Sequence, residues 1–187
     1  DATPNSDNAL LLIAALEMSG KKAQAFTFLE KHVQMHSNDI PSAMLLAERQ
    51  IGKDRAAAIK TYEQVLAKTP DNFVVLNNLA FLALEDKKLT RAEELAKKAV
   101  SLQRENADAA DTLAQIYIAK GDKAAALKLY EEVAARPIAN DDVYLNYVSV
   151  LLELDKKALA SRKLASREFK SEAAKQRAES LKQQYGL

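Results

Sequence analysis

The chain has 187 residues, of which 48% are apolar and 28% charged, and this composition supports one packed domain or one continuous repeat array. Its net charge of +1 excludes nucleic-acid binding through bulk positive charge, and the lack of cysteine excludes disulfides, thiolate nucleophiles and cysteine-ligated zinc. Because glycine and proline are scarce, at four each, and no apolar run approaches the roughly 18 residues of a membrane span, the composition predicts an all-helical protein without a membrane-inserted segment.

Three ladders of residues recur along the chain with one shared spacing, which indicates an internal repeat. One ladder is asparagine, one is alanine and one is a large apolar residue, and in each the successive steps are 33, 34, 34 and 34 residues. The ladders are Asn5, Asn38, Asn72, Asn106 and Asn140; Ala25, Ala58, Ala92, Ala126 and Ala160; and Leu12, Leu45, Leu79, Leu113 and Tyr147. They predict a single array over residues 1–187, with units at 5–37, 38–71, 72–105, 106–139 and 140–170.

Each unit has the pattern of two helices joined by a polar turn. Apolar residues spaced i, i+3, i+4 and i+7 define one face of each helix. The asparagine ladder precedes each first helix, where asparagine or aspartate can cap free N–H groups. The alanine ladder marks the crossing of the two helices, where a bulky replacement would overpack. Gly20 and Gly121 follow the first helices of units one and four, where a left-handed backbone favours glycine.

His32 and His36 lie four residues apart on the second helix of the first unit, so they share one face. This spacing occurs in metal sites, but the segment lacks the glutamate of a zinc-protease helix, and the chain has no other histidine. His32 also occupies an inner-face position that is Val65 and Val133 in later units. A packed structural histidine is the favoured interpretation, and metal-dependent catalysis at this pair is the alternative. We predict no catalytic residue, metal or cofactor.

A family signature is clearest in two segments, LNNLAFLALEDKKLTRAEELAKKAV (76–100) and DTLAQIYIAKGDKAAALKLYEEVA (111–134). Together with a proline turn at residues 69–72, they resemble the tetratricopeptide repeat family, whose unit is a helix–turn–helix of about 34 residues. The resemblance covers roughly residues 5–170. It implies an all-α, tetratricopeptide-type solenoid, a right-handed superhelix of helix–turn–helix repeats.

Three arginines depart from the pattern of this family. Arg49 stands where a buried aromatic or aliphatic residue is usual, and Arg104 replaces the expected turn proline. Arg167 falls where a small inner residue is usual. These departures put in doubt the tight packing of the ends of the array more than its fold.

The tail after the fifth unit has the pattern of a capping helix at about residues 171–185. A repeat array needs such a terminal element, with one apolar side and one polar side. The polar side is basic, so a membrane-surface or nucleic-acid-binding helix is the alternative, although the apolar stripe is rich in alanine. The stripe consists of Phe169, Ala173, Ala174, Ala178, Leu181 and Tyr185.

The resemblance implies that first helices line the inner side of the array and second helices its outer side. First-helix segments carry nine acidic residues against Arg49 and Lys120, so we expect an acidic inner side that favours basic or neutral protein segments. This charge argues against capture of a partner's terminal carboxylate, as some family members do. The family's ligand-lining positions map to a candidate groove for a protein or peptide partner: Asn77, Asn78, Phe81, Asp108, Asp111, Gln115, Leu145, Asn146 and Ser149.

The leading hypothesis is therefore a non-enzymatic scaffold that binds a protein segment in this groove, with no nucleic-acid partner. The alternative is a structural segment of a longer solenoid that assembles or self-associates through its ends.

A narrower resemblance concerns location. The segment AAAIKTYEQVLAKTPDNFVVLNNLAFLALE (56–85) is similar to repeats of bacterial lipoproteins in exopolysaccharide and PEP-CTERM protein-sorting systems. It implies a periplasmic protein, anchored to the outer membrane by a lipidated cysteine outside this sequence, and a cytoplasmic scaffold is the alternative. The first eight residues are polar and contain no signal region, so we expect the sequence to begin after a removed targeting segment or inside a longer chain.

Overall fold

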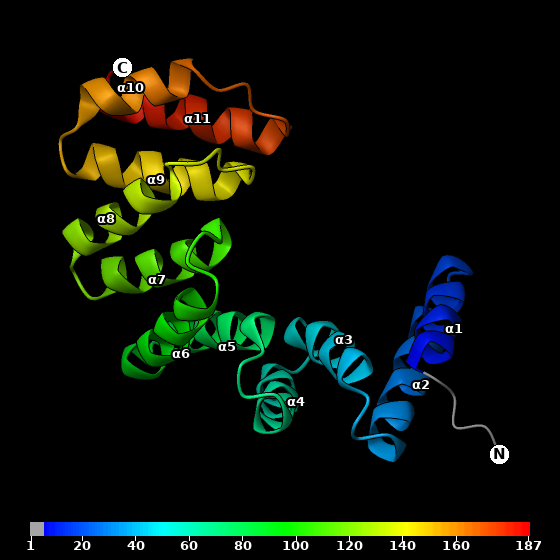
Figure 1. Cartoon of the computed structure of the whole chain (residues 1–187). Helices are drawn as coiled ribbons and strands as arrows, with labels where there is room; N and C mark the ends of the chain where they lie inside the picture. The colour runs from blue at the N-terminus through cyan, green and yellow to red at the C-terminus, as the bar shows by residue number, and fades with distance from the viewer. Residues whose placement is uncertain (1–5) are drawn as a thin grey trace. The chain divides into compact units, whose positions relative to one another are not determined.

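The computed structural model describes residues 6–187, and this part of the chain consists of eleven α-helices without a strand (Figure 1). The all-helical prediction is confirmed, and Asn5 lies outside the described residues. The helices are α1 (Ser6–Met18), α2 (Lys22–Met35), α3 (Ile40–Ile51), α4 (Arg55–Lys68), α5 (Phe73–Glu85), α6 (Leu89–Leu102), α7 (Ala107–Ala119), α8 (Lys123–Val133), α9 (Asp141–Glu153), α10 (Lys157–Ala165) and α11 (Glu172–Tyr185).

The chain divides into two compact units, residues 1–75 and 76–187, with the boundary inside α5. In the first unit α1 packs on α2, and α3 packs on α4. In the second unit α7 packs on α8, and α9 packs on both α10 and α11. These are the helix pairs that the repeat spacing predicts. The prediction of a single array over residues 1–187 depends on how the two units are placed relative to each other, so it stays a prediction.

Small side chains at the helix crossings let the paired helices approach closely. All five alanines of the ladder are at most 1% exposed, which agrees with their predicted position at the crossings. The ladder of large apolar residues is buried at Leu79, Leu113 and Tyr147 and half-buried at Leu45, but Leu12 is exposed and Ile13 takes the buried place beside it. The difference arises because α1 packs against α2 and α3 on one side only, so fewer of its apolar residues are covered.

Side-chain caps begin the first helices, as the asparagine ladder predicts. Asn106 Oδ1 accepts hydrogen bonds from the backbone N–H groups of the next turn at 3.0 and 3.1 Å, and Asn140 caps α9 in the same way. Asn72 Oδ1 accepts from the Val75 N–H. At α3 the cap is Asp39 instead of its neighbour in the ladder. An oxygen acceptor at these positions satisfies N–H groups that the helix itself leaves free.

Four turns after first helices share a left-handed residue. Gly20 and Gly121 have φ of 75° and 86°, which confirms the helix-ending role predicted for them. The equivalent residues of the third and fifth units are Lys87 at 59° and Asp155 at 57°. A Cβ makes this conformation costly, so these two positions carry backbone strain that glycine would relieve.

We expect Lys87→Gly to raise the free energy of unfolding by roughly 0.5–1 kcal/mol, because relief of the left-handed strain exceeds the entropy that glycine adds to the unfolded chain. Urea denaturation of the full chain measures this change. Gly121→Lys is the matched reverse substitution, and it should lower stability, since open space surrounds Gly121 and only the backbone resists the new side chain. A Lys87→Gly variant less stable than the natural chain would contradict the strain assignment.

His32 is a packed structural histidine, which is the interpretation that the sequence favours. It is 2% exposed, and its ring nitrogen Nε2 lies 2.8 Å from Asp39 Oδ2. Although burial opposes ionisation of Asp39, hydrogen bonds from His32 and Ser42 hold the pKa of this carboxyl below its ordinary value. The pair therefore ties α2 to the start of α3. Within residues 6–187, no group of three or more His, Cys, Asp or Glu side chains is arranged to hold a metal ion.

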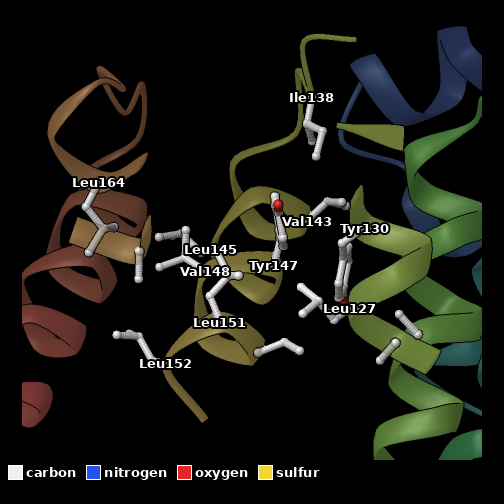
Figure 2. Close-up of a cluster of buried hydrophobic side chains, with 14 of the residues drawn as sticks. Leu127, Tyr130, Ile138, Val143, Leu145, Tyr147, Val148, Leu151, Leu152 and Leu164 are labelled. Atoms are coloured by element: carbon white, nitrogen blue, oxygen red, sulfur yellow. The ribbon is translucent and has the colours of Figure 1, made fainter. Parts of the chain in front are cut away.

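The fifth repeat has a core on both sides of α9. Figure 2 shows Tyr147 directed toward Tyr130 of α8, and Leu145 and Val148 on the side of Leu164 of α10. The apolar stripe of the tail packs into the same core through Phe169 and α11, in agreement with a capping helix. Ala173 is the exception, since it is exposed. The buried tail residues are Phe169, Ala174 and Ala178, with Leu181 and Tyr185 partly buried.

Arg167 explains how the chain leaves α10 and enters the capping helix. Its guanidinium donates to Asp141 Oδ1 at 2.6 and 2.9 Å and to the carbonyl oxygens of Ile138 and Ala139. It also lies 4.3 Å from the centre of the Tyr144 ring. The arginine at this unusual position is therefore a clamp between the start of α9 and the turn before α11.

Candidate partner-binding surface

The nine residues predicted to line a groove all lie on α5, α7 and α9 of the second unit, and all but Asp108 occupy positions that recur within the set at a step of 34 or 68 residues. Equivalent positions in stacked repeats fall on one face. We use the name first-helix surface for Asn77 and Phe81 of α5, Asp108 and Gln115 of α7, and Ser149 of α9.

Phe81 and Asn77 give α5 its most distinctive surface feature. Phe81 is 46% exposed, although it is a large apolar side chain. Asn77 lies one turn earlier on the same face, and its Oδ1 is buried without a hydrogen-bond partner. A buried oxygen without a donor costs about 1–3 kcal/mol, so a hydrogen bond from a bound molecule that reached this atom would be favourable. Asn78, next in sequence, is half-buried.

Asp111 lies at the centre of a polar network. Its Oδ1 accepts hydrogen bonds from the Tyr130 hydroxyl at 2.5 Å and from Asn146 Nδ2 at 2.8 Å, and Gln115 Nε2 donates to the Tyr130 oxygen at 3.3 Å. Burial raises the pKa of the Asp111 carboxyl above its ordinary value, despite the opposing effect of these donors. Burial and the nearby carboxylate also raise the pKa of Tyr130, which keeps its hydroxyl a donor. The network holds α7, α8 and α9 together.

The network continues into the capping helix. Asn146 Oδ1 accepts a hydrogen bond from Arg177 Nη2 of α11 at 2.6 Å. Arg177 Nη1 also lies 3.7 Å from Asp142 Oδ1. Asp111 and Asn146 therefore already have partners within the chain, and no sequence signal marks Tyr130 or Arg177 as those partners. A tyrosine within an apolar stripe indicates packing, and its hydroxyl becomes informative only when the facing carboxylate is known.

The two remaining predicted residues lie on α9 and differ in exposure. Leu145 is fully buried in the core cluster that includes Ala174 and Ala178, because α11 packs on α9. It has no surface for a partner and leaves the candidate set, which corrects the prediction. Ser149 is half-buried, and its hydroxyl donates to the Leu145 carbonyl oxygen at 2.8 Å.

The acidic surface predicted for the inner side involves fewer carboxylates than the nine acidic residues counted in the first-helix segments. Asp111 is used inside the network, and Arg177 brings a cation close to Asp142. Asp108 is exposed and accepts a hydrogen bond from Asn140 Nδ2 at 2.9 Å. In the first turns of α7 and α9, the exposed carboxylates are those of Asp108 and Asp142.

Two family models match the central part of the chain, and both describe a tetratricopeptide repeat. One matches residues 52–116 and the other residues 106–136. Residues 52–136 therefore carry tetratricopeptide repeats. The tetratricopeptide fold extends over the helices outside these matches as well, since solved tetratricopeptide structures align with most of the chain. No curated protein matches the sequence.

Solved structures of low sequence identity share this fold. A thermophilic tetratricopeptide repeat protein of Thermus thermophilus is 19% identical, with a TM-score of 0.72, over 94% of this chain and 98% of that one. MamA of Desulfovibrio magneticus RS-1 is 13% identical, with a TM-score of 0.71, over 88% and 93%. PilF of Pseudomonas aeruginosa is 16% identical, with a TM-score of 0.73, over 99% and 78%. These likenesses show the fold alone, and they do not support the narrower resemblance to exopolysaccharide-system lipoproteins.

None of the helices in residues 6–187 combines the length and the apolar character that crossing a membrane requires.

Proposed function

We propose that this tetratricopeptide repeat chain is a non-enzymatic scaffold whose second unit binds a segment of a protein partner on the first-helix surface. The observation that carries the proposal is Phe81, which exposes 46% of its area beside the unpartnered oxygen of Asn77. Exposed aromatic side chains are common anchors of protein interfaces. The amide oxygen of Asn77, one turn away, would accept a hydrogen bond from a backbone N–H of the bound segment and so fix the orientation of that segment.

The partner segment favoured by this surface is neutral or basic and carries an apolar side chain. Asp108 presents its carboxylate to solvent, and Asp142 beside this surface does so too, with Arg177 Nη1 at 3.7 Å, while none of the five residues of the first-helix surface is a cation. Like charges across an interface oppose binding, so an acidic segment is disfavoured here.

The proposal is tested with 12-residue peptides selected from a random display library against the full chain. We expect Phe81→Ala to weaken the selected peptides at least tenfold in fluorescence polarisation, because loss of a central aromatic anchor costs about 2 kcal/mol. The matched control is Leu102→Ala, which removes an apolar side chain of similar exposure, 41%, from the second helix α6.

Peptides that lose affinity with Leu102→Ala and keep it with Phe81→Ala would place the binding surface on the second helices. Circular dichroism of both variants separates this outcome from a loss of structure. Since both side chains are largely exposed, neither substitution should unfold the chain.

A second candidate function is assembly through the first unit, and the exposed side of α1 favours it. Leu11 is 67% and Met18 89% exposed, and the two lie seven residues apart on one helix face. An apolar face of this kind in a repeat array is suited to pack against a further helix, here one from a second copy.

Light scattering across a concentration series tests assembly through α1. We expect the natural chain to form a dimer, and the double variant Leu11→Glu with Met18→Glu to be a monomer. A natural chain that is monomeric at all concentrations would contradict this second function.

A further inference from the structure

The first unit contains a cavity of about 330 Å³ lined by α1, α2 and α3. Its floor consists of Ile13, Ala25 and Leu29, which are all at most 2% exposed, and the Phe26 ring forms part of its wall. Ligand pockets in proteins range from about 300 to 1,000 Å³, so this cavity suits one large side chain. It lies on a different unit from the first-helix surface, and its lining includes the second helix α2.

The cavity lies beside the arginine that departs from the repeat pattern. The residues equivalent to Arg49 in later repeats are Ala83, Tyr117 and Leu151, and Leu151 is fully buried in its core. A guanidinium is too costly to bury in an apolar seam without a partner. Arg49 turns outward instead, where its Nε and Nη2 donate to the two carboxylate oxygens of Glu17 at 3.1 and 3.2 Å. A tyrosine or leucine in place of Arg49, as in the fourth and fifth repeats, would put an apolar side chain at this cavity.

The rim of the cavity is positively charged. Lys22, Arg49 and Lys53 line it, against the single carboxylate of Glu17. That carboxylate is engaged by Arg49, which leaves the two lysines as the excess charge. The Lys53 ammonium lies 3.9 Å from the centre of the Phe26 ring, so a cation is held directly at the edge of the apolar wall.

We propose that this cavity, the Arg49 pocket, binds a partner segment in which a large aromatic or aliphatic side chain is followed by acidic residues. The apolar side chain enters the space that Arg49 leaves open and takes the place that Tyr117 and Leu151 occupy in their own repeats. The acidic residues meet Lys22 and Lys53 on the rim. Apolar volume and positive charge occur together here, whereas the exposed carboxylates of α7 and α9 favour a neutral or basic segment, so the two surfaces select different sequences.

The chain contains no tryptophan, so a peptide that carries one reports its own environment by fluorescence. The probe is the acetylated and amidated peptide Ala-Ala-Trp-Glu-Glu-Ala, titrated with the full 187-residue chain. We expect a saturable blue shift of tryptophan emission, and roughly tenfold weaker binding when both glutamates of the peptide are replaced by lysine. Replacement of the tryptophan by alanine, followed with a fluorescein label, should abolish binding.

Two variants of the chain locate the pocket. Arg49→Tyr fills it with the residue of the fourth repeat, and we expect at least tenfold weaker peptide binding together with a higher thermal midpoint. Lys22→Glu changes the rim charge and should weaken binding severalfold while it leaves the fold intact, because an acidic residue is favoured in the first turn of α2. Lys31→Glu makes the same change of charge on an exposed part of α2 outside the pocket, and its affinity should stay within twofold of the natural chain.

The proposal is overturned if the natural chain produces no saturable shift at millimolar concentrations, or if Arg49→Tyr binds the peptide as the natural chain does. Equal effects of Lys22→Glu and Lys31→Glu would also overturn it, because peptide binding would then depend on the net charge of the chain and not on the charge at the rim of the pocket. Phe81→Ala should leave this peptide unaffected, so the test is independent of the first-helix surface.

Discussion

Tyr130→Ala is expected to lower the free energy of unfolding of the second unit by about 3–5 kcal/mol, the cost of deleting a fully buried aromatic ring. Tyr130 has no exposed area, and its ring stacks on Tyr147 with centres 5.5 Å apart. Its hydroxyl also supplies one of the donors to the buried Asp111 carboxylate. Chemical denaturation followed by circular dichroism measures the loss.

Tyr130→Phe is the matched variant that separates the ring from the hydroxyl. It retains the packing with Tyr147 but removes one of the two donors that α8 and α9 supply to Asp111 Oδ1, so that the amide of Asn146 remains. We expect a smaller loss of about 1–2 kcal/mol, the penalty of an under-satisfied buried carboxylate. A Tyr130→Phe variant as unstable as Tyr130→Ala would mean that the polar network, rather than the ring, dominates.

Arg167→Ala is expected to cost about 2–3 kcal/mol, because it leaves the largely buried Asp141 carboxylate and two carbonyl oxygens without their charged donor. Arg167→Lys should recover only part of this, since an ammonium cannot reproduce the planar fork. The control is Arg162→Ala, an exposed arginine of α10, which should stay within about 0.5 kcal/mol of the natural chain. Equal effects of the two alanine variants would contradict the clamp.

The same clamp predicts a dependence on pH. The backbone N–H of Lys170 and the Arg167 guanidinium hold the pKa of Asp141 below its ordinary value of 3.8. The stability that the carboxylate contributes is therefore fully present above pH 3.8 and is lost as the pH falls through the lowered pKa of the folded state. The difference in unfolding free energy between the natural chain and Asp141→Asn should shrink over that acidic range.

The helices and their crossings can be predicted because the signals that specify them are local. Apolar spacing within one helix and a residue ladder with a step of 34 both report on neighbours along the chain. The burial of Ala92 and Ala126 and the left-handed φ of Gly121 follow from these signals. The left-handed backbone of Lys87 is harder to predict from the sequence, because lysine has no preference for that conformation.

The candidate surface is harder to predict because it depends on which side chains meet across helices. The repeat register identifies Arg49 and Arg167 as anomalous, but their partners lie 32 and 26 residues away on other helices. Leu145 has the register of a lining residue, yet α11 packs over α9 and buries it. Asp111 counts as a free charge in the sequence, although buried donors from α8 and α9 surround it.

Site-directed photo-cross-linking tests the central claim most directly, because a chain without cysteine accepts a single labelled cysteine at any chosen position. Ser149→Cys places a benzophenone probe on the first helix α9, and Ser161→Cys places it on the second helix α10. With a peptide selected on the full chain, we predict efficient cross-linking from position 149, little from position 161, and loss of the product in a Phe81→Ala background. Preferential cross-linking from position 161, unchanged by Phe81→Ala, would contradict binding on the first-helix surface.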